Sequence, residues 1–233
     1  MKLSVIVPCF NEAANIPLIL KRFEESINRS GIELILVDNG STDNSQSVLA
    51  ELLPNYSFAR VVKVEHNQGY GFGILSGLKA AEGEFLCWTH ADMQTDPGDV
   101  IKALYLVENA ATPEKTFVKG TRKGRPLRDN IFSLGMGLFN SIYLGAFLTE
   151  INAQPNLFHR SFFNSFVAPP YDFSLDLYAY YLARRQKLTI IRFPVLFPER
   201  IHGHSHWNID FASKWKLIKR TLKFSVKLKR ELQ

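Results

Sequence analysis

Residues 3–12 read LSVIVPCFNE, a short apolar run that ends at a proline and passes into polar residues. A run of this length, rich in β-branched residues and closed by a breaker, predicts a buried strand. Residues 32–37, IELILV, repeat the pattern and lead into Asp38-Asn39-Gly40-Ser41, which is turn chemistry. Between the two runs, Asn15 and Pro17 predict the start of a helix. The order strand, helix, strand indicates a βαβ unit of a parallel sheet.

The alternation continues beyond this unit. We expect further strands near Val61–Val64, Phe85–Trp88, Thr116–Lys119 and Leu188–Val195. The expected helices are Thr42–Leu53, a glycine-studded helix after Gly69, Pro97–Asn109, 131–149 and Phe173–Arg185. We find no repeat and no linker. The prediction is one α/β domain over residues 1–209, with a mostly parallel central sheet flanked by helices, and a basic amphipathic C-terminal helix over 210–233.

The composition is that of a globular protein. Of the 233 residues, 46% are hydrophobic and 21% are charged, which excludes disordered, collagen-like and coiled-coil chains. Cys9 and Cys87 are the two cysteines, so we expect no disulfide framework and a reducing compartment. The first residues lack the pattern of a signal peptide, because Pro8 interrupts the apolar run.

A cluster of positive charges and a long uncharged stretch both lie in the second half of the chain. The formal net charge of the chain is +6. Eight of its lysines and arginines lie between residues 214 and 230. A one-sided basic segment suits phosphate groups of nucleic acid or lipid heads, and a solvated helix face is the alternative. Residues 131–149 carry no charge, but Gly135, Gly137 and Ser141 dilute their hydrophobicity. We therefore expect a membrane-interface or buried helix there rather than a membrane span.

Polar residues follow each of the first four predicted strands. Asn11 and Glu12 follow the first, Asp38–Asp43 the second, Asn67–Gly69 the third and His90–Gln94 the fourth. Each group alone would be turn or cap chemistry. In an open α/β sheet, however, the carboxyl ends of parallel strands share one edge, where ligands bind. The sequence therefore predicts a functional cleft at this edge.

The residue types indicate what such a cleft binds. Asp38 can accept hydrogen bonds from a base or a ribose. His90, Asp92 and Gln94 alternate, so in an extended segment their side chains would lie on one face. An imidazole nitrogen, a carboxylate and an amide oxygen could share one Mn²⁺ or Mg²⁺ ion. The chain lacks both the dinucleotide fingerprint and the P-loop sequence, so neither of those nucleotide sites is expected.

Four motifs resemble family 2 glycosyltransferases of the GT-A fold. They are SVIVPCFNE at 4–12, VDNGSTD at 37–43, NQGYG at 67–71 and ADMQ at 91–94. Two downstream motifs, Gly120-Thr121-Arg122 and residues 200–205, RIHGHS, are similar to the polyprenol-phosphate sugar synthase branch, which includes dolichol-phosphate mannose synthase. The likeness covers about residues 3–207.

The resemblance implies a hexosyltransferase that uses a UDP- or GDP-linked sugar and a dolichyl or undecaprenyl phosphate, with inversion. Such an enzyme would be held peripherally at the cytoplasmic face of a membrane. The nucleotide pocket would be lined by Pro8, Glu12 and Asp38, with Asn11, Asn39, Asp43, Asn67 and Gly69 as further candidates. A Mg²⁺ or Mn²⁺ ion would be held by Asp92 and Gln94, with His90 beside them. Arg122, Arg200 and Ser205 would contact the donor diphosphate or the acceptor phosphate, and Arg128 and Ser133 would lie near the lipid phosphate.

The chain departs from the family pattern in three places. His90-Ala91-Asp92 stands where Asp-x-Asp is usual. Gly203-His204-Ser205-His206 replaces Gly-x-Ser-Lys, which exchanges a fixed positive charge for one that titrates near neutrality. Residues 152–158, NAQPNLF, replace a Ser-Gly-Phe-Arg-like run that shapes the acceptor side. The acceptor itself could therefore differ from the usual one.

Two alternatives stay open. The same fold could transfer a sugar to a saccharide hydroxyl in surface polysaccharide assembly, which requires a general base. Asp172 and Asp176 are the candidates for that base, and the other interpretation of Asp176 is a solvated or capping carboxylate on a helix. A chain that has lost turnover would instead be a nucleotide-sugar-binding module. Nucleic-acid binding is not expected, because the basic tail contains no recognised reading motif.

Overall fold

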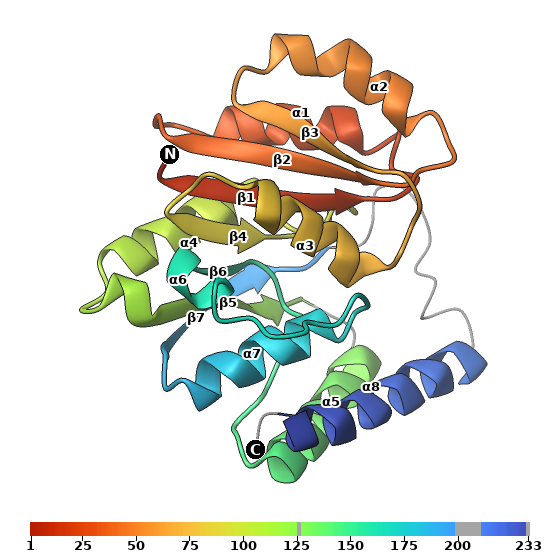
Figure 1. The fold of residues 1–233 in the computed structure, drawn as a ribbon, viewed down its shortest axis with the longest axis vertical. Coiled ribbons are helices and arrows are strands. Elements are labelled where there is room, and N and C mark those ends of the chain that lie inside the picture. The colour runs from red at the N-terminus through yellow and green to blue at the C-terminus, as the bar shows by residue number, and fades with distance from the viewer. Residues whose placement is uncertain (125–126, 199–210, 232–233) are drawn as a thin grey trace.

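The computed structural model describes residues 1–124, 127–198 and 211–231, without the side chains of residues 127–132, 211–217 and 231 (Figure 1). In this part of the chain seven strands form one sheet, in the order β3-β2-β1-β4-β6-β5-β7. The strands are β1 (Leu3–Cys9), β2 (Ile32–Asn39), β3 (Ala59–Val64), β4 (Phe85–Trp88), β5 (Thr116–Lys123), β6 (Asn156–His159) and β7 (Thr189–Leu196). The helices are α1 (Ile16–Ser26), α2 (Ser45–Leu52), α3 (Tyr70–Ala80), α4 (Pro97–Glu108), α5 (Leu127–Leu144), α6 (Arg160–Phe163), α7 (Leu175–Arg185) and α8 (Phe211–Glu231), with short 3-10 turns at Leu53–Asn55 and Pro113–Lys115.

All strands except β6 run in the same direction. β1 pairs in parallel with β2 and β4, β2 with β3, and β5 with β7. β6 lies antiparallel between β4 and β5. The carboxyl ends of the parallel strands therefore share one edge, and β6 begins at that same edge. The expected α/β architecture with a mostly parallel sheet is confirmed.

Helices cover both faces of the sheet. Side chains alternate along β2, so that Leu34 and Leu36 pack with α1, α2 and α4, whereas Ile35 and Val37 pack with α3 and α7. Strands buried on both faces read as continuous apolar runs, which is why the sequence predicts them well. The pair formed by α5 and α8 lies beyond α7 (Figure 1), where Ser225 Oγ donates a hydrogen bond to Asn140 Oδ1 at 2.5 Å.

Three features differ from the sequence predictions. The strand β6 was not predicted, because only Leu157 and Phe158 among its four residues form an apolar run, whereas all four residues of β4 are apolar. The strand β5 continues past the expected end at Lys119 to Lys123, and α5 begins at Leu127 rather than at residue 131. The uncharged helix ends at Leu144, before Gly145 with φ 65°, rather than at residue 149. Within the described ranges, no helix is both long and apolar enough to span a membrane.

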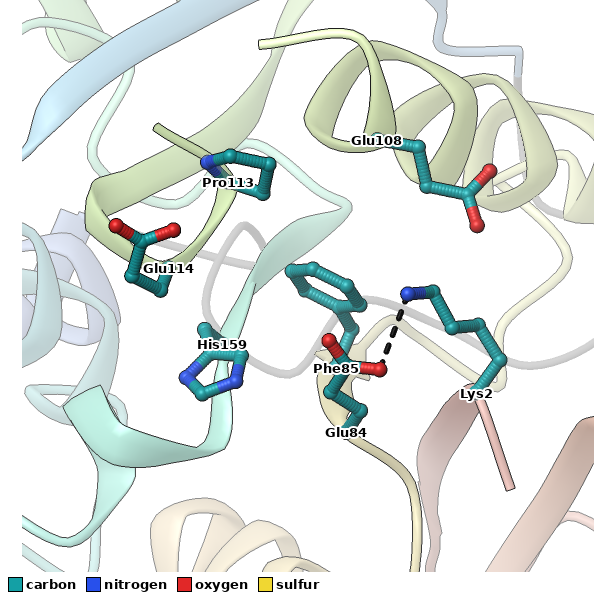
Figure 2. Close-up of a pocket in the computed structure, with 7 residues that line it drawn as sticks. All are labelled: Lys2, Glu84, Phe85, Glu108, Pro113, Glu114 and His159. Carbon is teal, nitrogen blue, oxygen red and sulfur yellow. Dashed lines mark hydrogen bonds and ion pairs between the residues drawn. The ribbon is translucent and has the colours of Figure 1, made fainter. Parts of the chain in front are cut away.

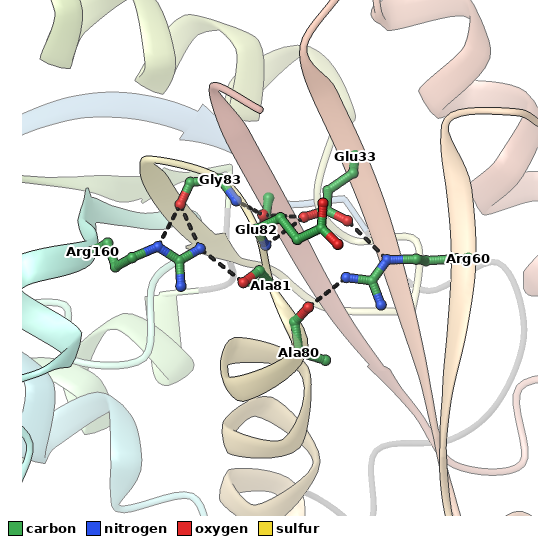
Figure 3. Close-up of polar contacts among 8 residues, drawn as sticks. Glu33, Arg60, Ala80, Ala81, Glu82, Gly83 and Arg160 are labelled. Atoms are coloured by element: carbon green, nitrogen blue, oxygen red, sulfur yellow. Dashed lines mark hydrogen bonds and ion pairs between the residues drawn. The ribbon is translucent and has the colours of Figure 1, made fainter.

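The amino edge of the sheet is held by a polar network around Glu33. Its carboxylate accepts hydrogen bonds from Ser4 Oγ at 2.5 Å, the N–H of Glu82 at 2.8 Å and Arg60 Nε at 2.9 Å. Figure 3 shows Arg60 and Arg160 reaching the turn at residues 80–83 from two sides, where both donate to backbone carbonyls. The turn that leads into β4 is thereby tied to β1, β2, β3 and α6.

Glu33 makes acid stability a test of this network. Burial alone would raise the pKa of Glu33, but the bonds from Ser4, the Glu82 backbone and Arg60 hold it below its ordinary value of 4.5. A carboxyl with a lowered pKa in the folded state contributes fully above its ordinary pKa, and the contribution is lost as the pH falls through the folded value. We expect Glu33→Gln to lower the free energy of unfolding at pH 7 by about 1–3 kcal/mol and to flatten the loss of stability below pH 4.5.

Denaturant unfolding between pH 3 and pH 7 is the measurement. Glu51→Gln, at an exposed position of α2, is the control and should follow the unchanged protein. Parallel acid curves for Glu33→Gln and the unchanged protein would contradict the assigned role.

Candidate active site

The loops that follow β1 and β2 are joined by the side chains of Asn11 and Asp43. Asn11 Oδ1 accepts hydrogen bonds from the N–H groups of Thr42 and Asp43 at 2.8 and 3.3 Å. In return, the N–H of Ala13 donates to Asp43 Oδ2 at 3.2 Å. Asn11 has a φ of 58°, a left-handed conformation that asparagine tolerates better than most residues. Both side chains were expected at the nucleotide, and both connect the two loops that would surround it.

Glu12 and Pro8 lie at the same edge. The N–H of Glu12 donates to Ser45 Oγ at 3.0 Å, and its carboxylate accepts from Asn15 Nδ2 at 2.5 Å. A Cβ built on Gly73 would lie 3.3 Å from Pro8 Cβ, so α3 passes close to the end of β1. The backbone at this edge of the sheet is therefore tightly packed.

Two buried acceptors at the end of β2 lack a hydrogen-bond partner among the described residues. Asp38 is 1% exposed; its Oδ1 accepts from the N–H of Ser41 at 3.0 Å, while its Oδ2 has no partner. Asn39 donates through Nδ2 to the carbonyl of Gly69 at 3.0 Å, and its Oδ1 has none. Leaving a buried acceptor unpaired costs about 1–3 kcal/mol, so a pair of them indicates a place where a ligand donates.

The loop at Asn67–Gly69 is packed between two backbone segments. Asn67 Oδ1 accepts from the N–H of Gly69 at 2.8 Å. Gly69 has a φ of 114°, and a Cβ there would lie 2.4 Å from the carbonyl oxygen of Tyr171. On the other side, a Cβ on Gly40 would lie 2.5 Å from the nitrogen of Asn67. Only glycine fits these two approaches, which places the loop beside Asp38 and Asn39.

The predicted metal ligands lie in a turn, not in the extended segment that their alternation suggested. Met93 has a φ of 61°, and Asp92 Oδ1 accepts from the N–H of Gln94 at 3.1 Å. Gln94 Nε2 donates to the carbonyl of Pro198 at 2.7 Å. Asp92 is buried and His90 is half-buried. The described residues contain no group of three His, Cys, Asp or Glu side chains that could hold a metal.

His90 belongs to a column of stacked rings. Its imidazole stacks on Tyr70 at 5.6 Å between centroids, and Tyr70 stacks on Phe173 at 4.5 Å. The guanidinium of Arg220, on α8, lies 5.4 Å from the Phe173 ring. Tyr70 was not singled out in the sequence, where an aromatic residue at a helix start has no distinguishing signal. The column connects the end of β4 to the C-terminal helix.

Arg122, the penultimate residue of β5, lies at the same edge and is paired with Glu150. Arg122 Nε lies 2.7 Å from Glu150 Oε2, and the guanidinium lies 5.5 Å from the Phe197 ring. The predicted residues Arg200 and Ser205 lie outside the described residues, as does the side chain of Arg128. The structure therefore places Arg122 at the carboxyl edge of the sheet and leaves these other phosphate contacts as predictions.

Asp176 lies at the start of α7 and is enclosed rather than solvated. It is 1% exposed, and its Oδ1 accepts from Trp88 Nε1, Gln154 Nε2 and Asn156 Nδ2 at 3.0, 3.0 and 3.1 Å. The interpretation as a solvated helix carboxylate is therefore wrong. Asn156 Oδ1 in turn accepts from the ammonium of Lys119, at 2.8 Å. Lys119, a lone charge at the end of a predicted strand, was the available signal for this network.

A cavity of about 360 Å³ lies at the opposite edge of the sheet (Figure 2). Lys2, Glu84, Phe85, Glu108, Pro113, Glu114 and His159 line it. Lys2 and Glu84 form an ion pair across it at 3.0 Å. None of its polar side-chain atoms is among the buried atoms that lack a partner in the described chain. We therefore place the candidate site at the carboxyl edge, where such atoms gather.

Comparison with known proteins places these features in a family. The family profile "Glycosyl transferase family 2" matches residues 4–173. An undecaprenyl-phosphate 4-deoxy-4-formamido-L-arabinose transferase of Proteus mirabilis is 34% identical over 127 residues, 52% of this chain and 37% of that protein. The protein of the same name from Pseudomonas paraeruginosa is 36% identical over 112 residues, 46% of this chain and 32% of that protein. The match thus spans about a third of the length of these relatives.

Solved structures show the same fold. Glucosyl-3-phosphoglycerate synthase of Mycobacterium tuberculosis, in complex with Mn²⁺, UDP-glucose and phosphoglyceric acid, superposes with a TM-score of 0.74 at 18% identity, over 98% of this chain and 79% of that one. Its complex with UDP gives a TM-score of 0.72 at 20% identity, over 98% and 80% of the two chains. The GT-A fold expected from the sequence motifs is confirmed.

The close approach of β5 to the segment at 154–155 can be tested with a single methyl group. A Cβ on Gly120 would lie 2.0 Å from the carbonyl oxygen of Gln154, so Gly120→Ala should lower the free energy of unfolding by about 1–3 kcal/mol or more. Gly135→Ala is the matched control, because a Cβ there meets nothing within 4 Å and the residue lies within α5. We expect this control to be unchanged or stabilised by about 0.5–1 kcal/mol. Equal melting temperatures for the two variants would contradict the packing described here.

Proposed function

The chain belongs to glycosyl transferase family 2, and on this basis we propose that it transfers a hexose from a nucleotide-diphosphate sugar to a polyprenyl phosphate with inversion. The observation that carries the proposal is the pair of buried acceptors, Asp38 Oδ2 and Asn39 Oδ1, which no described residue satisfies. The N–H groups of a nucleotide base supply the donors that such atoms need. The base would be uracil or guanine.

The donor diphosphate would lie toward Asp92. A carboxylate, an imidazole nitrogen and an amide oxygen are suitable ligands for Mg²⁺ or Mn²⁺, so Asp92, with His90 and Gln94, fits a divalent cation in its donor chemistry. A bound cation would neutralise charge on the leaving diphosphate. In this structure, the Tyr70 ring fixes the plane of His90 and the Pro198 carbonyl fixes the amide of Gln94. The solved neighbour that binds Mn²⁺ and UDP-glucose supports this choice of cofactor.

The acceptor would be a phosphate on a polyprenyl chain. A phosphate oxygen, already anionic at pH 7, attacks the anomeric carbon, and the bond from that carbon to the diphosphate oxygen breaks. No proton has to be removed, so no general base is required. This agrees with the enclosure of Asp176, whose Oδ1 already accepts three hydrogen bonds. The curated relatives, named as undecaprenyl-phosphate sugar transferases, support a lipid phosphate as the acceptor.

A peripheral membrane surface on α5 would bring the acceptor to the site. Leu134, Leu138 and Ile142 recur every four residues on α5 and are 65, 59 and 75% exposed. The neighbouring helix α8 exposes Lys219, Lys223, Lys227 and Arg230. An apolar stripe beside exposed cations suits an interface with anionic lipid heads. The cytoplasmic face of the membrane is the expected side.

Transfer itself is the first test of this function. The protein is incubated with labelled UDP- and GDP-sugars, Mn²⁺ or Mg²⁺, and polyprenyl phosphate, and label that enters the organic phase is counted. We expect lipid-dependent labelling with one donor. Asp92→Asn should lower it by about 100-fold or more, because the carboxylate that would hold the cation is lost. Asp38→Asn should weaken nucleotide binding by about tenfold.

Glu51→Gln, on exposed α2, is the control and should transfer as the unchanged protein does. Nucleotide release without labelled lipid would indicate a hydroxyl acceptor or water. Binding without release across the panel would indicate a binding module and would refute the transferase.

Membrane association has its own test. We expect the double variant Leu138→Asn/Ile142→Asn to lose about tenfold or more in partition to vesicles of phosphatidylglycerol and phosphatidylcholine, because two large apolar side chains no longer enter the interface. Sedimentation with the vesicles measures the partition. Tyr105→Asn, at a 66% exposed position of α4, is the control and should partition as before. Unchanged partition of the double variant would contradict a membrane surface on α5.

A further inference from the structure

The acidic residue closest to the proposed phosphate contact is Glu150, which lies between α5 and β6. Its Oε2 atom accepts from Arg122 Nε at 2.7 Å and lies 3.4 Å from the backbone nitrogen of Arg122. The two side chains are only 8% and 20% exposed, so the pair is partly withdrawn from water. Such a pair is stronger than one at the surface.

Glu150 contacts the guanidinium of Arg122 at Nε, and this choice of atom decides which nitrogens remain for a phosphate. A guanidinium has two terminal nitrogens that match the oxygens of a phosphate, and Nε lies at the other side of the group. Glu150 contacts Nε, and the terminal nitrogens of Arg122 make no hydrogen bond to the described residues. The pairing therefore orients the group through Nε and does not occupy the terminal nitrogens.

The backbone of Glu150 is itself held in an uncommon conformation. Its φ is 52°, in the left-handed region that residues with a side chain seldom adopt. Such a conformation persists only where the surroundings determine it, and it is frequent at functional sites.

Residues 149–153, which include Glu150, are held by hydrogen bonds that involve three strands and one helix. Arg192, on β7, donates to Thr149 Oγ1. Lys119, on β5, donates to the carbonyls of Ile151 and Ala153, both at 2.7 Å. Asn156, at the start of β6, connects Lys119 to Asp176 of α7. These contacts leave the segment little freedom on either side of Glu150.

Resting on the proposed function, we infer that Glu150 is a positioning residue, which holds Arg122 through Nε so that its terminal nitrogens face the phosphate of the polyprenyl acceptor. Arg122 would contact the phosphate, and Glu150 would act through Arg122. The buried contacts of Lys119, Asn156 and Asp176 would keep Glu150 in place.

The experiment is a double-mutant cycle on acceptor binding. Farnesyl phosphate, a short polyprenyl phosphate that stays in solution, is titrated by calorimetry into the full chain and into Glu150→Gln, Arg122→Ala and the double variant. We expect Glu150→Gln to weaken binding by about tenfold and Arg122→Ala to add little in the Glu150→Gln background, because residues that act as one unit are not additive. In the transfer assay, the KM for the lipid should rise while the KM for the nucleotide sugar stays within about threefold.

Glu108→Gln is the matched control, because Glu108 forms an ion pair with Arg29 at 2.8 Å at the far edge of the sheet, and its loss should leave farnesyl phosphate binding unchanged. The melting temperature of each variant separates misfolding from a local effect. Tighter binding by Glu150→Gln would mean that the carboxylate competes with the phosphate, and additive losses would mean that the two residues act separately. Either result would overturn the inference.

The proposed function and this inference fail in different ways. If the unchanged protein labels no lipid but the cycle shows coupling, the transferase assignment fails and the positioning role stands. If lipid is labelled and the cycle is additive, the positioning role fails alone. If the unchanged protein does not bind farnesyl phosphate, both are wrong.

Discussion

A lysine ammonium inside the sheet constrains the active-site edge. Lys119 is fully buried on β5, and this burial lowers its pKa to about 7, although Asp176 acts in the opposite direction. A buried ammonium requires acceptors on all sides, and the carbonyls of Ile151 and Ala153 together with Asn156 Oδ1 supply them. The chain between α5 and β6 must therefore cross the end of β5. Gly120, which follows Lys119, leaves room for that crossing.

The consequences extend from this crossing to the residues proposed to hold each of the two substrates. On the acceptor side, the crossing segment presents Glu150 to Arg122. On the donor side, Asp176 accepts from Trp88, which ends the strand before His90, and Gln154 lies 3.3 Å from the hydroxyl of Tyr70. One buried polar network thus touches the elements that would hold the donor and those that would hold the acceptor. The hydrogen bonds of this network restrict the side chains that they join.

The two edges of the sheet differ in how completely their polar groups are paired. At the amino edge, both carboxylate oxygens of Glu33 have partners, and two arginines close the turn before β4. At the carboxyl edge, Asp38, Asn39 and Asp176 each keep a buried oxygen without a partner in the described chain. The saturated edge contributes stability, and the unsaturated edge keeps acceptors for a ligand at a cost in stability.

The sequence by itself determined six of the seven strands and one half of the candidate site. Strands buried on both faces have an unmistakable apolar pattern, and the motifs after β1, β2, β3 and β4 are local, so the donor side from Asp38 to Asp92 could be predicted. The tertiary structure alone decided the other half. The antiparallel strand β6 has an apolar run of only two residues, which is too short for a pattern. It reverses direction to bring Asn156 beside Lys119 and Asp176, residues far apart in the chain. A contact between distant residues leaves no periodic signal, because it depends on how the strands are ordered in the sheet.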